Sequence, residues 1–205
     1  MKTNRREQLI ITLAMSVPML AAAVIDSATG KAGMAFYAIS AILCFFILYA
    51  LLSVLDRNLE GWKTIICDIF MITAIYLSNR FDLYHRFWFF DIVLHSFSGL
   101  IIAIVLPAIF LSDKSRKSMS TLELAFISFV FAVAAAGFWE IIEFFFDLIT
   151  GSDVQRNLIR EREIFSSQWQ NPGILDTMND IINGTAGGLI GSILIYISER
   201  LKKED

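Results

Sequence analysis

The chain has 205 residues, of which 56% are hydrophobic and 18 are phenylalanine, and its mean hydropathy is +0.62. Its formal net charge of −3 is small, and no block of basic residues indicates nucleic-acid binding. Several apolar runs reach the length needed to cross a bilayer. The composition therefore places the chain among polytopic membrane proteins. The lipid bilayer is an expected partner, and no nucleic-acid partner is expected.

Six apolar segments are predicted to span the membrane as helices, which satisfy all backbone polar groups internally. In chain order they cover residues 9–25, 33–55, 62–78, 88–111, 122–149 and 174–198. The basic residues before the first segment also fit a cleavable signal peptide. We expect one all-α domain over residues 1–205, a six-transmembrane-helix bundle. The long connection 150–173 is either a solvated loop or a lid over a site beneath it, and it includes a short helix at 155–163 and a turn at 168–173 as predicted features.

The distribution of lysine and arginine predicts the orientation of the helices. Eleven of the 17 basic residues lie in segments on the side of the two termini, and the other six lie on the opposite side. Cytoplasmic loops of membrane proteins carry an excess of these residues. Both termini are therefore expected to be cytoplasmic.

Two glutamates interrupt the fifth apolar segment, in the stretch Phe138-Trp139-Glu140-Ile141-Ile142-Glu143-Phe144. One acidic residue at the centre of a spanning helix costs roughly 2.5–3.5 kcal/mol on insertion scales, so two of them require an explanation. The fourth segment adds Asp91 and His95, and the sixth adds Asp176, Asp180 and Asn183.

These polar residues are predicted to lie at a similar depth. Segments four and six enter from the outer face and segment five leaves through it, which puts all the residues roughly 3–14 Å below that face. Residues spaced by three or four positions share a face of a helix. Small residues continue the same faces and indicate closely packed helices: Ala132, Ala136, Gly184, Gly187, Gly188 and Gly191.

The predicted cluster is strongly acidic, since the three segments contain no lysine or arginine. Ionised carboxylates close together in a low dielectric repel one another strongly. Three arrangements would reduce this repulsion: a bound divalent cation, protonation of several carboxyls, or a water-filled cavity that loop arginines reach. Asp, Glu and His suit Mg²⁺, Mn²⁺, Fe²⁺ or Zn²⁺, which the sequence does not distinguish. A polar network that merely holds the helices together is the structural alternative.

From this pattern we predict a functional site near the outer face. The catalytic candidates are Glu140, Glu143 and His95. The candidate metal ligands are Asp91, His95, Glu140, Glu143, Asp176 and Asp180, with Asn183 and Asp147 as accessory polar groups. Outside this cluster, Asp68 lies alone in the third segment, where a protonated or hydroxyl-bonded acid is the favoured interpretation.

Three motifs in this order carry a resemblance: Asp91-x-x-x-His95, Phe138-Trp139-Glu140-x-x-Glu143-Phe144 and Asp176-Thr177-x-x-Asp180. They resemble the YjdF-like family of bacterial inner-membrane proteins over about residues 90–191. The resemblance implies a multi-pass protein of the bacterial cytoplasmic membrane and marks the six Asp, His and Glu residues as signature positions. The chain departs from that family at residues 167–171. A weaker likeness, carried by residues 180–183 and the glycines after them, is to VanZ-like membrane proteins.

Neither resemblance implies a known reaction, and whether the chain is an enzyme is left open. The leading hypothesis is a metal-dependent hydrolase or transferase that acts on a lipid or a lipid-linked substrate. The alternatives are a proton- or cation-coupled transporter of small solutes and a non-catalytic scaffold or partner protein. The chain has no HExxH, Gly-x-Ser-x-Gly or Walker motif.

Overall fold

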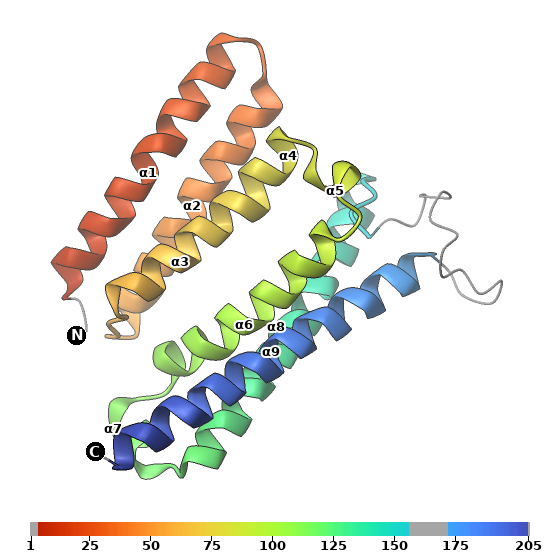
Figure 1. Cartoon of the computed structure of the whole chain (residues 1–205). Helices are drawn as coiled ribbons and strands as arrows, with labels where there is room; N and C mark the ends of the chain where they lie inside the picture. Colours follow the sequence, from red (N-terminus) through yellow and green to blue (C-terminus); the bar gives the residue numbers. More distant parts are fainter. Residues whose placement is uncertain (1–3, 156–171, 205) are drawn as a thin grey trace. The chain divides into compact units, whose positions relative to one another are not determined.

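The computed structural model describes residues 4–155 and 172–204, and helices make up most of this part (Figure 1). Six helical stretches within it are long and apolar enough to cross a membrane. They are α1 (Arg5–Ala28), α2 (Ala32–Val54), the continuous stretch Gly61–Arg80, α6 (Phe90–Phe110), α8 (Thr121–Thr150) and α9 (Pro172–Glu204). The predicted all-α class with six spanning helices is confirmed.

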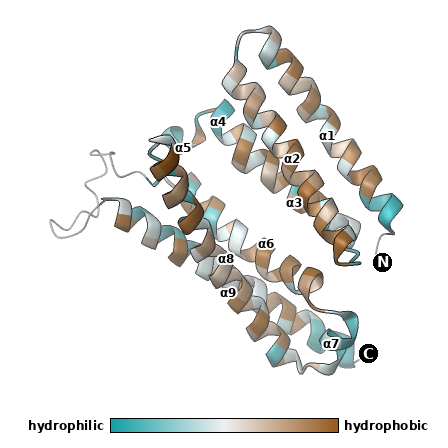
Figure 2. Cartoon of the chain, turned by 180° about the vertical axis from the view of Figure 1, so that it is seen from behind, coloured by the Kyte–Doolittle hydropathy of each residue, from teal (hydrophilic) through white to brown (hydrophobic). Residues whose placement is uncertain are grey.

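The surface of these helices is suited to hydrocarbon. Large apolar side chains are exposed along them, for example Val17 at 66%, Phe36 at 65% and Leu122 at 69%. Figure 2 shows hydrophobic residues along the long helices and hydrophilic residues at several of their ends, such as the start of α1. In water such a surface would aggregate, whereas in a bilayer it faces lipid.

Local capping explains why two helices begin where they do. The Asn4 side chain accepts a hydrogen bond from the backbone of Glu7 (2.9 Å), and the Glu7 carboxylate accepts one from the backbone of Asn4 (3.0 Å). Ser120 and Glu123 form the same reciprocal pair at the start of α8. At the other end, Gly151 adopts a φ of 68° and ends α8. The first helix therefore begins before the apolar segment itself.

The third span is less regular than its hydropathy predicts. It consists of α3 (Gly61–Met71), a π-helical stretch η1 (Ile72–Leu77) and α4 (Ser78–Arg80). Two short helices in the connections were also not predicted, α5 (Leu83–Arg86) and α7 (Asp113–Ser118). A π-helical turn widens the helix locally and often marks a functional position.

The chain divides into two compact units, each of which we describe by itself. The first unit comprises residues 1–90 and 105–118, and the second comprises residues 91–104 and 119–205. The core of the first unit joins side chains of α1, α2 and η1, namely Met19, Ala23, Ala38, Ala41, Phe45 and Tyr76. The expectation of a single domain stays a prediction.

In the second unit, glycines bring α6 and α9 into backbone contact. A Cβ atom added to Gly99 would overlap the backbone of Gly184, and one added to Gly187 would overlap the backbone of Ser96. Only glycine allows two helices to approach so closely. Because Ser96 directly follows His95, this contact also fixes where His95 lies relative to α9.

The remaining small residues pack α8 against α9 in the same unit. A Cβ atom on Gly188 would lie 2.5 Å from the Cβ of Ala132, and one on Gly184 would lie 3.1 Å from the Cβ of Ala136. The small-residue faces predicted from the sequence are therefore packed faces. They hold α8 and α9 close to each other along this stretch.

Candidate metal centre

The first two groups of the site come from one turn of α6. Asp91 lies in the first turn of the helix and His95 lies one turn later. The Nε2 atom of His95 is 3.6 Å from Oδ1 of Asp91, and each side chain is 14% exposed. The i,i+4 spacing therefore places both groups on one face, as predicted.

The third group comes from α9. Oδ2 of Asp180 lies 3.4 Å from Nε2 of His95, and the Asp180 side chain is 6% exposed. One ligand atom from each of Asp91, His95 and Asp180 lies within 4.8 Å of the others. Three of the six predicted metal ligands thus converge on one point.

The two distances from His95 are compatible with a metal site. Strong hydrogen bonds between nitrogen and oxygen are about 2.7–3.2 Å long, and both contacts, at 3.6 and 3.4 Å, exceed that range. Two ligands that bind one ion at about 2.0–2.2 Å in tetrahedral geometry lie about 3.4 Å apart. One imidazole nitrogen and two carboxylates also form a donor set that Zn²⁺, Mn²⁺ or Fe²⁺ accepts. The geometry and the chemistry of this set both fit a divalent cation.

Glu140 lies beside this set, on α8. Its side chain is buried, at 5% exposure. A side-chain hydrogen bond joins it to Thr177 of α9, and the carboxyl is close enough to Asp91 for the two charges to interact. Thr177 in turn accepts a hydrogen bond of 3.2 Å from the side-chain amide of Gln155. Glu140 is therefore held in position by a chain of two polar side chains.

Glu143 is held differently, although it is only three residues away. The indole Nε1 of Trp139 donates a hydrogen bond of 2.6 Å to Oε1 of Glu143. The Glu143 carboxyl interacts electrostatically with Glu140, Asp176 and Asp91, but it is not in the group within 4.8 Å. Glu143 and Asp176 therefore lie near the three converging ligands but outside the group within 4.8 Å.

The two accessory residues have different positions. Asn183 is half-buried on α9, one turn beyond Asp180. Asp147 accepts hydrogen bonds from the hydroxyl of Ser152 (2.6 Å) and from the backbone of Val154 (2.8 Å) and Gln155 (2.9 Å). Asp147 thus fixes the segment that follows α8 and, through Gln155, supports Thr177 and Glu140. The predicted short helix, turn and lid fall mostly on residues 156–171, which lie outside the described part.

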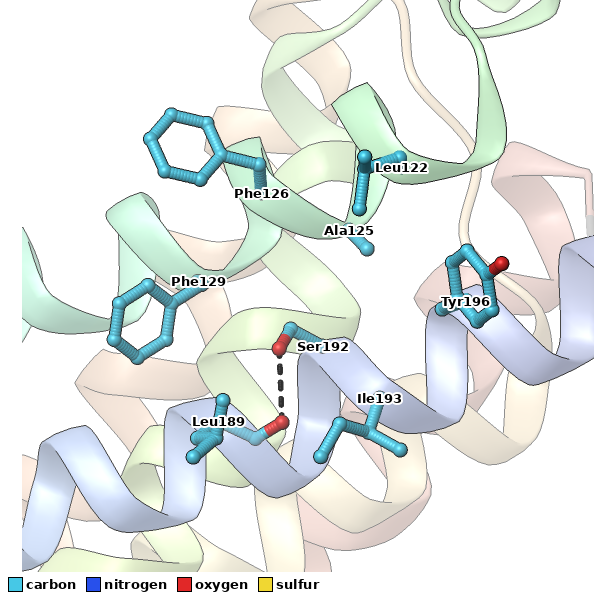
Figure 3. A pocket seen from close by; sticks show the side chains of 8 residues that line it. All are labelled: Leu122, Ala125, Phe126, Phe129, Leu189, Ser192, Ile193 and Tyr196. Carbon is cyan, nitrogen blue, oxygen red and sulfur yellow. Dashed lines mark hydrogen bonds between the residues drawn. The ribbon is translucent and has the colours of Figure 1, made fainter.

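The second unit also has an apolar groove between α8 and α9 (Figure 3). Its walls are Leu122, Ala125, Phe126, Phe129, Leu189, Ser192, Ile193 and Tyr196. The hydroxyl of Ser192 donates to the backbone oxygen of Leu189 (2.8 Å), so it is satisfied within its own helix. The groove therefore offers a hydrocarbon surface on the same two helices that carry Glu140 and Asp180.

Sequence reasoning missed a polar group in the first unit. Asp26 of α1 is 1% exposed. The hydroxyl of Tyr76 donates a hydrogen bond of 2.8 Å to its Oδ2, and Nη1 of Arg80 lies 3.0 Å from its Oδ1. The comparison of crossing directions that aligned the acidic residues would also have found this ion pair if it had included basic residues. Spans one and three both end on the same face.

We expect Asp26 and Arg80 to be energetically coupled. Asp26→Asn should lower the free energy of unfolding by about 1–3 kcal/mol, because it weakens two charge-assisted contacts of a buried carboxylate. Arg80→Gln should cost at least as much, because it leaves the buried Asp26 carboxylate without its cation, whereas the 30% exposed Arg80 can still reach water in Asp26→Asn. Thermal unfolding of both single variants and the double variant checks this. Additive effects would contradict the pairing.

Comparison with known proteins identifies a protein family. Residues 8–200 match the model of a family described as "Predicted membrane protein (DUF2238)". The match covers all six spans and confirms the YjdF-like resemblance, while nothing supports the likeness to VanZ-like proteins. No curated protein and no solved structure matches the chain.

Proposed function

The chain belongs to the DUF2238 family of predicted membrane proteins, and from the geometry of the site we propose that it is a metal-dependent membrane hydrolase or transferase. One observation carries the proposal: Nε2 of His95 lies 3.6 Å from Asp91 and 3.4 Å from Asp180, distances that fit ligands of one divalent ion. Asp91, His95 and Asp180 would hold the ion. When bound, it would polarise a phosphoryl or carbonyl oxygen of the substrate.

Glu140 is the general base in this proposal. Its carboxyl is buried beside the three ligands and is oriented by Thr177, so it can accept a proton from an attacking water or hydroxyl group. Glu143, held by Trp139, and Asp176 would add negative charge that strengthens cation binding. Such an arrangement, with reacting groups on packed helices and further groups that orient them, is what metal-assisted hydrolysis requires.

The apolar groove supports a lipid or lipid-linked substrate. Its residue Ser192 follows Asp180 by twelve positions on α9, which corresponds to roughly 18 Å along the helix. A hydrocarbon tail that extends from a headgroup at Asp180 would pass this groove within a bilayer core about 30 Å thick. In this proposal the metal centre acts on the headgroup, and the groove holds part of the tail.

The orientation of the protein is part of the proposal. With both termini in the cytoplasm of a bacterium, as the excess of basic residues on that side supports, the metal centre opens towards the outer face of the inner membrane. The substrate would then be a lipid of the outer leaflet.

Turnover of defined lipids tests the proposal. The full chain is reconstituted with Mn²⁺ in liposomes of phosphatidylethanolamine, phosphatidylglycerol and a polyprenyl diphosphate, and products are measured by mass spectrometry. We expect a headgroup-cleaved or headgroup-exchanged product that disappears with EDTA. Glu140→Gln should slow its formation by about 10²–10⁴-fold while Mn²⁺ still binds, because a general base contributes a factor of this size.

The matched control is Glu123→Gln on the same helix. Glu123 caps the far end of α8, and glutamine can also serve at that capping position, so turnover should be unchanged. Absence of any product with these lipids, or equal rates for the wild type and Glu140→Gln, would contradict the proposed activity.

A further inference from the structure

A second buried polar group lies in the first unit, where α1 and α3 pack together (Figure 1). Gln8 and Thr12 of α1 are 1% and 2% exposed, and Thr64 and Asp68 of α3 are 2% and 1% exposed. Within each helix the two residues are four positions apart and share a face. The side-chain amide of Gln8 donates to the backbone oxygen of Leu59 (3.4 Å), which directs this face of α1 towards the beginning of α3.

Two oxygen atoms of this group lack a hydrogen-bond partner. Oδ2 of Asp68 and Oγ1 of Thr64 are fully buried, and neither is bonded to any residue that the structure describes. They lie one turn apart on the same face of α3 but do not bond each other. A buried polar atom without a partner costs about 1–3 kcal/mol, and more if it is charged. Two such atoms one helical turn apart therefore indicate that a ligand supplies the missing contacts.

The charge of the group limits which ligand fits. Asp68 is the one acidic residue among the four, and the other three are neutral side chains that offer oxygen atoms. A monovalent cation neutralises one carboxylate, whereas a divalent ion would leave a net positive charge buried. A water molecule could also satisfy both oxygens if Asp68 were protonated, and the response to Na⁺ described below separates that case from a bound cation. The π-helical stretch η1 begins one turn after Asp68, and such stretches are frequent at functional positions.

We propose that Asp68 and Thr64 bind one monovalent metal cation within the first unit, between Oδ2 of Asp68 and Oγ1 of Thr64. Gln8 and Thr12 are further buried polar side chains on α1, the helix that packs against α3. This site is independent of the metal centre, because its residues and its unit are different. The bound cation carries a single charge, and Na⁺ is the ion used to test for it.

Thermal unfolding of the purified full chain tests the proposal. Melting temperatures are measured at one pH in NaCl and in choline chloride of equal ionic strength. At tenfold excess over the dissociation constant, Na⁺ should raise the melting temperature of the wild type by roughly 3–6 °C. Asp68→Asn should abolish this rise. Thr64→Val, which keeps the shape of threonine and removes its hydroxyl, should weaken the apparent affinity by at least about tenfold.

The control variant is Asp56→Asn in the same unit. Asp56 is exposed, with an 86% exposed side chain paired to Arg5, so its variant should keep the full response to Na⁺. Equal melting temperatures in NaCl and choline chloride would overturn the proposal and would indicate a protonated Asp68 with bound water. An unchanged response in Asp68→Asn would also overturn it. If Asp68→Asn does not fold, direct binding of radioactive Na⁺ to the wild type decides, and binding well below one ion per chain overturns the site.

Discussion

Replacing Gly187 with alanine is expected to destabilise the protein by about 1–3 kcal/mol, or more if α6 cannot move. The new Cβ atom would overlap backbone atoms of Ser96. No change of rotamer relieves a clash with backbone, so the two helices must separate. Since Ser96 follows His95, the separation should also move His95 away from Asp180 and weaken metal binding. Thermal unfolding with and without Mn²⁺ measures both effects.

Gly137 provides a matched control for this substitution. A Cβ atom at Gly137 of α8 would meet nothing within 4 Å. Because glycine within a helix is less favourable than alanine by about 0.5–1 kcal/mol, Gly137→Ala should leave stability unchanged or raise it. The two Gly→Ala substitutions are thus expected to have opposite effects. Equal melting temperatures for the two variants would show that α6 and α9 are not in backbone contact at Gly187.

Asp180→Asn is expected to remove the stabilisation that a divalent metal gives the wild type. At a Mn²⁺ concentration of 100 times the dissociation constant, binding should stabilise the native state by about 2.7 kcal/mol. Loss of one of three protein ligands should weaken affinity by at least about 100-fold, since loss of an outer partner alone costs 10–100-fold. The same Mn²⁺ concentration should then stabilise the variant by only about 0.4 kcal/mol. Melting temperatures in Mn²⁺ and in EDTA measure the difference.

Asp147→Asn is the control for loss of a carboxylate. Asp147 accepts its hydrogen bonds from Ser152, Val154 and Gln155, so the variant should melt at a lower temperature in both buffers. Its response to Mn²⁺ should nevertheless persist. If Asp147→Asn lost the response and Asp180→Asn kept it, the ligand set would be wrong.

Most of the fold follows from hydropathy. The six spanning helices were predicted within a few residues at most of their ends, because a bilayer requires long apolar helices and little else. The exceptions have local causes. The capping pair Asn4 and Glu7 extends α1 beyond its apolar segment, and η1 interrupts the third span without a signal in composition.

The grouping of Asp91, His95 and Asp180 was also predictable from the sequence, but the places of the remaining acidic residues were not. Helical spacing and the direction in which each span crosses the membrane placed Asp91, His95 and Asp180 at one predicted depth and on faces predicted to be packed. The two glutamates of α8, however, differ by about 60° around the helix axis. This difference directs Glu140 towards Thr177 and leaves Glu143 to Trp139. Spacing alone does not decide which member of a pair reaches a partner on another helix.

Asp26 and Arg80 show a different limit of sequence reasoning. Both residues lie just outside the predicted spans 9–25 and 62–78, where single charges are ordinary. Their pairing depends on how α1 packs against the end of the third span, where Tyr76 also contacts Asp26. Similarly, Asp68 was predicted to be either protonated or bonded to a hydroxyl group, and Thr64 lies at the right spacing for such a bond. The two side chains do not bond each other, and only the structure reveals this.

Elemental analysis of the purified full chain is the most direct test of the metal centre. After reconstitution with Mn²⁺ and removal of free metal, the wild type should retain about one ion per chain, as expected for one site with three protein ligands. His95→Gln and Asp180→Asn should each retain less than about a tenth of that amount. A wild type without stoichiometric metal, or variants that retain as much as the wild type, would contradict the account.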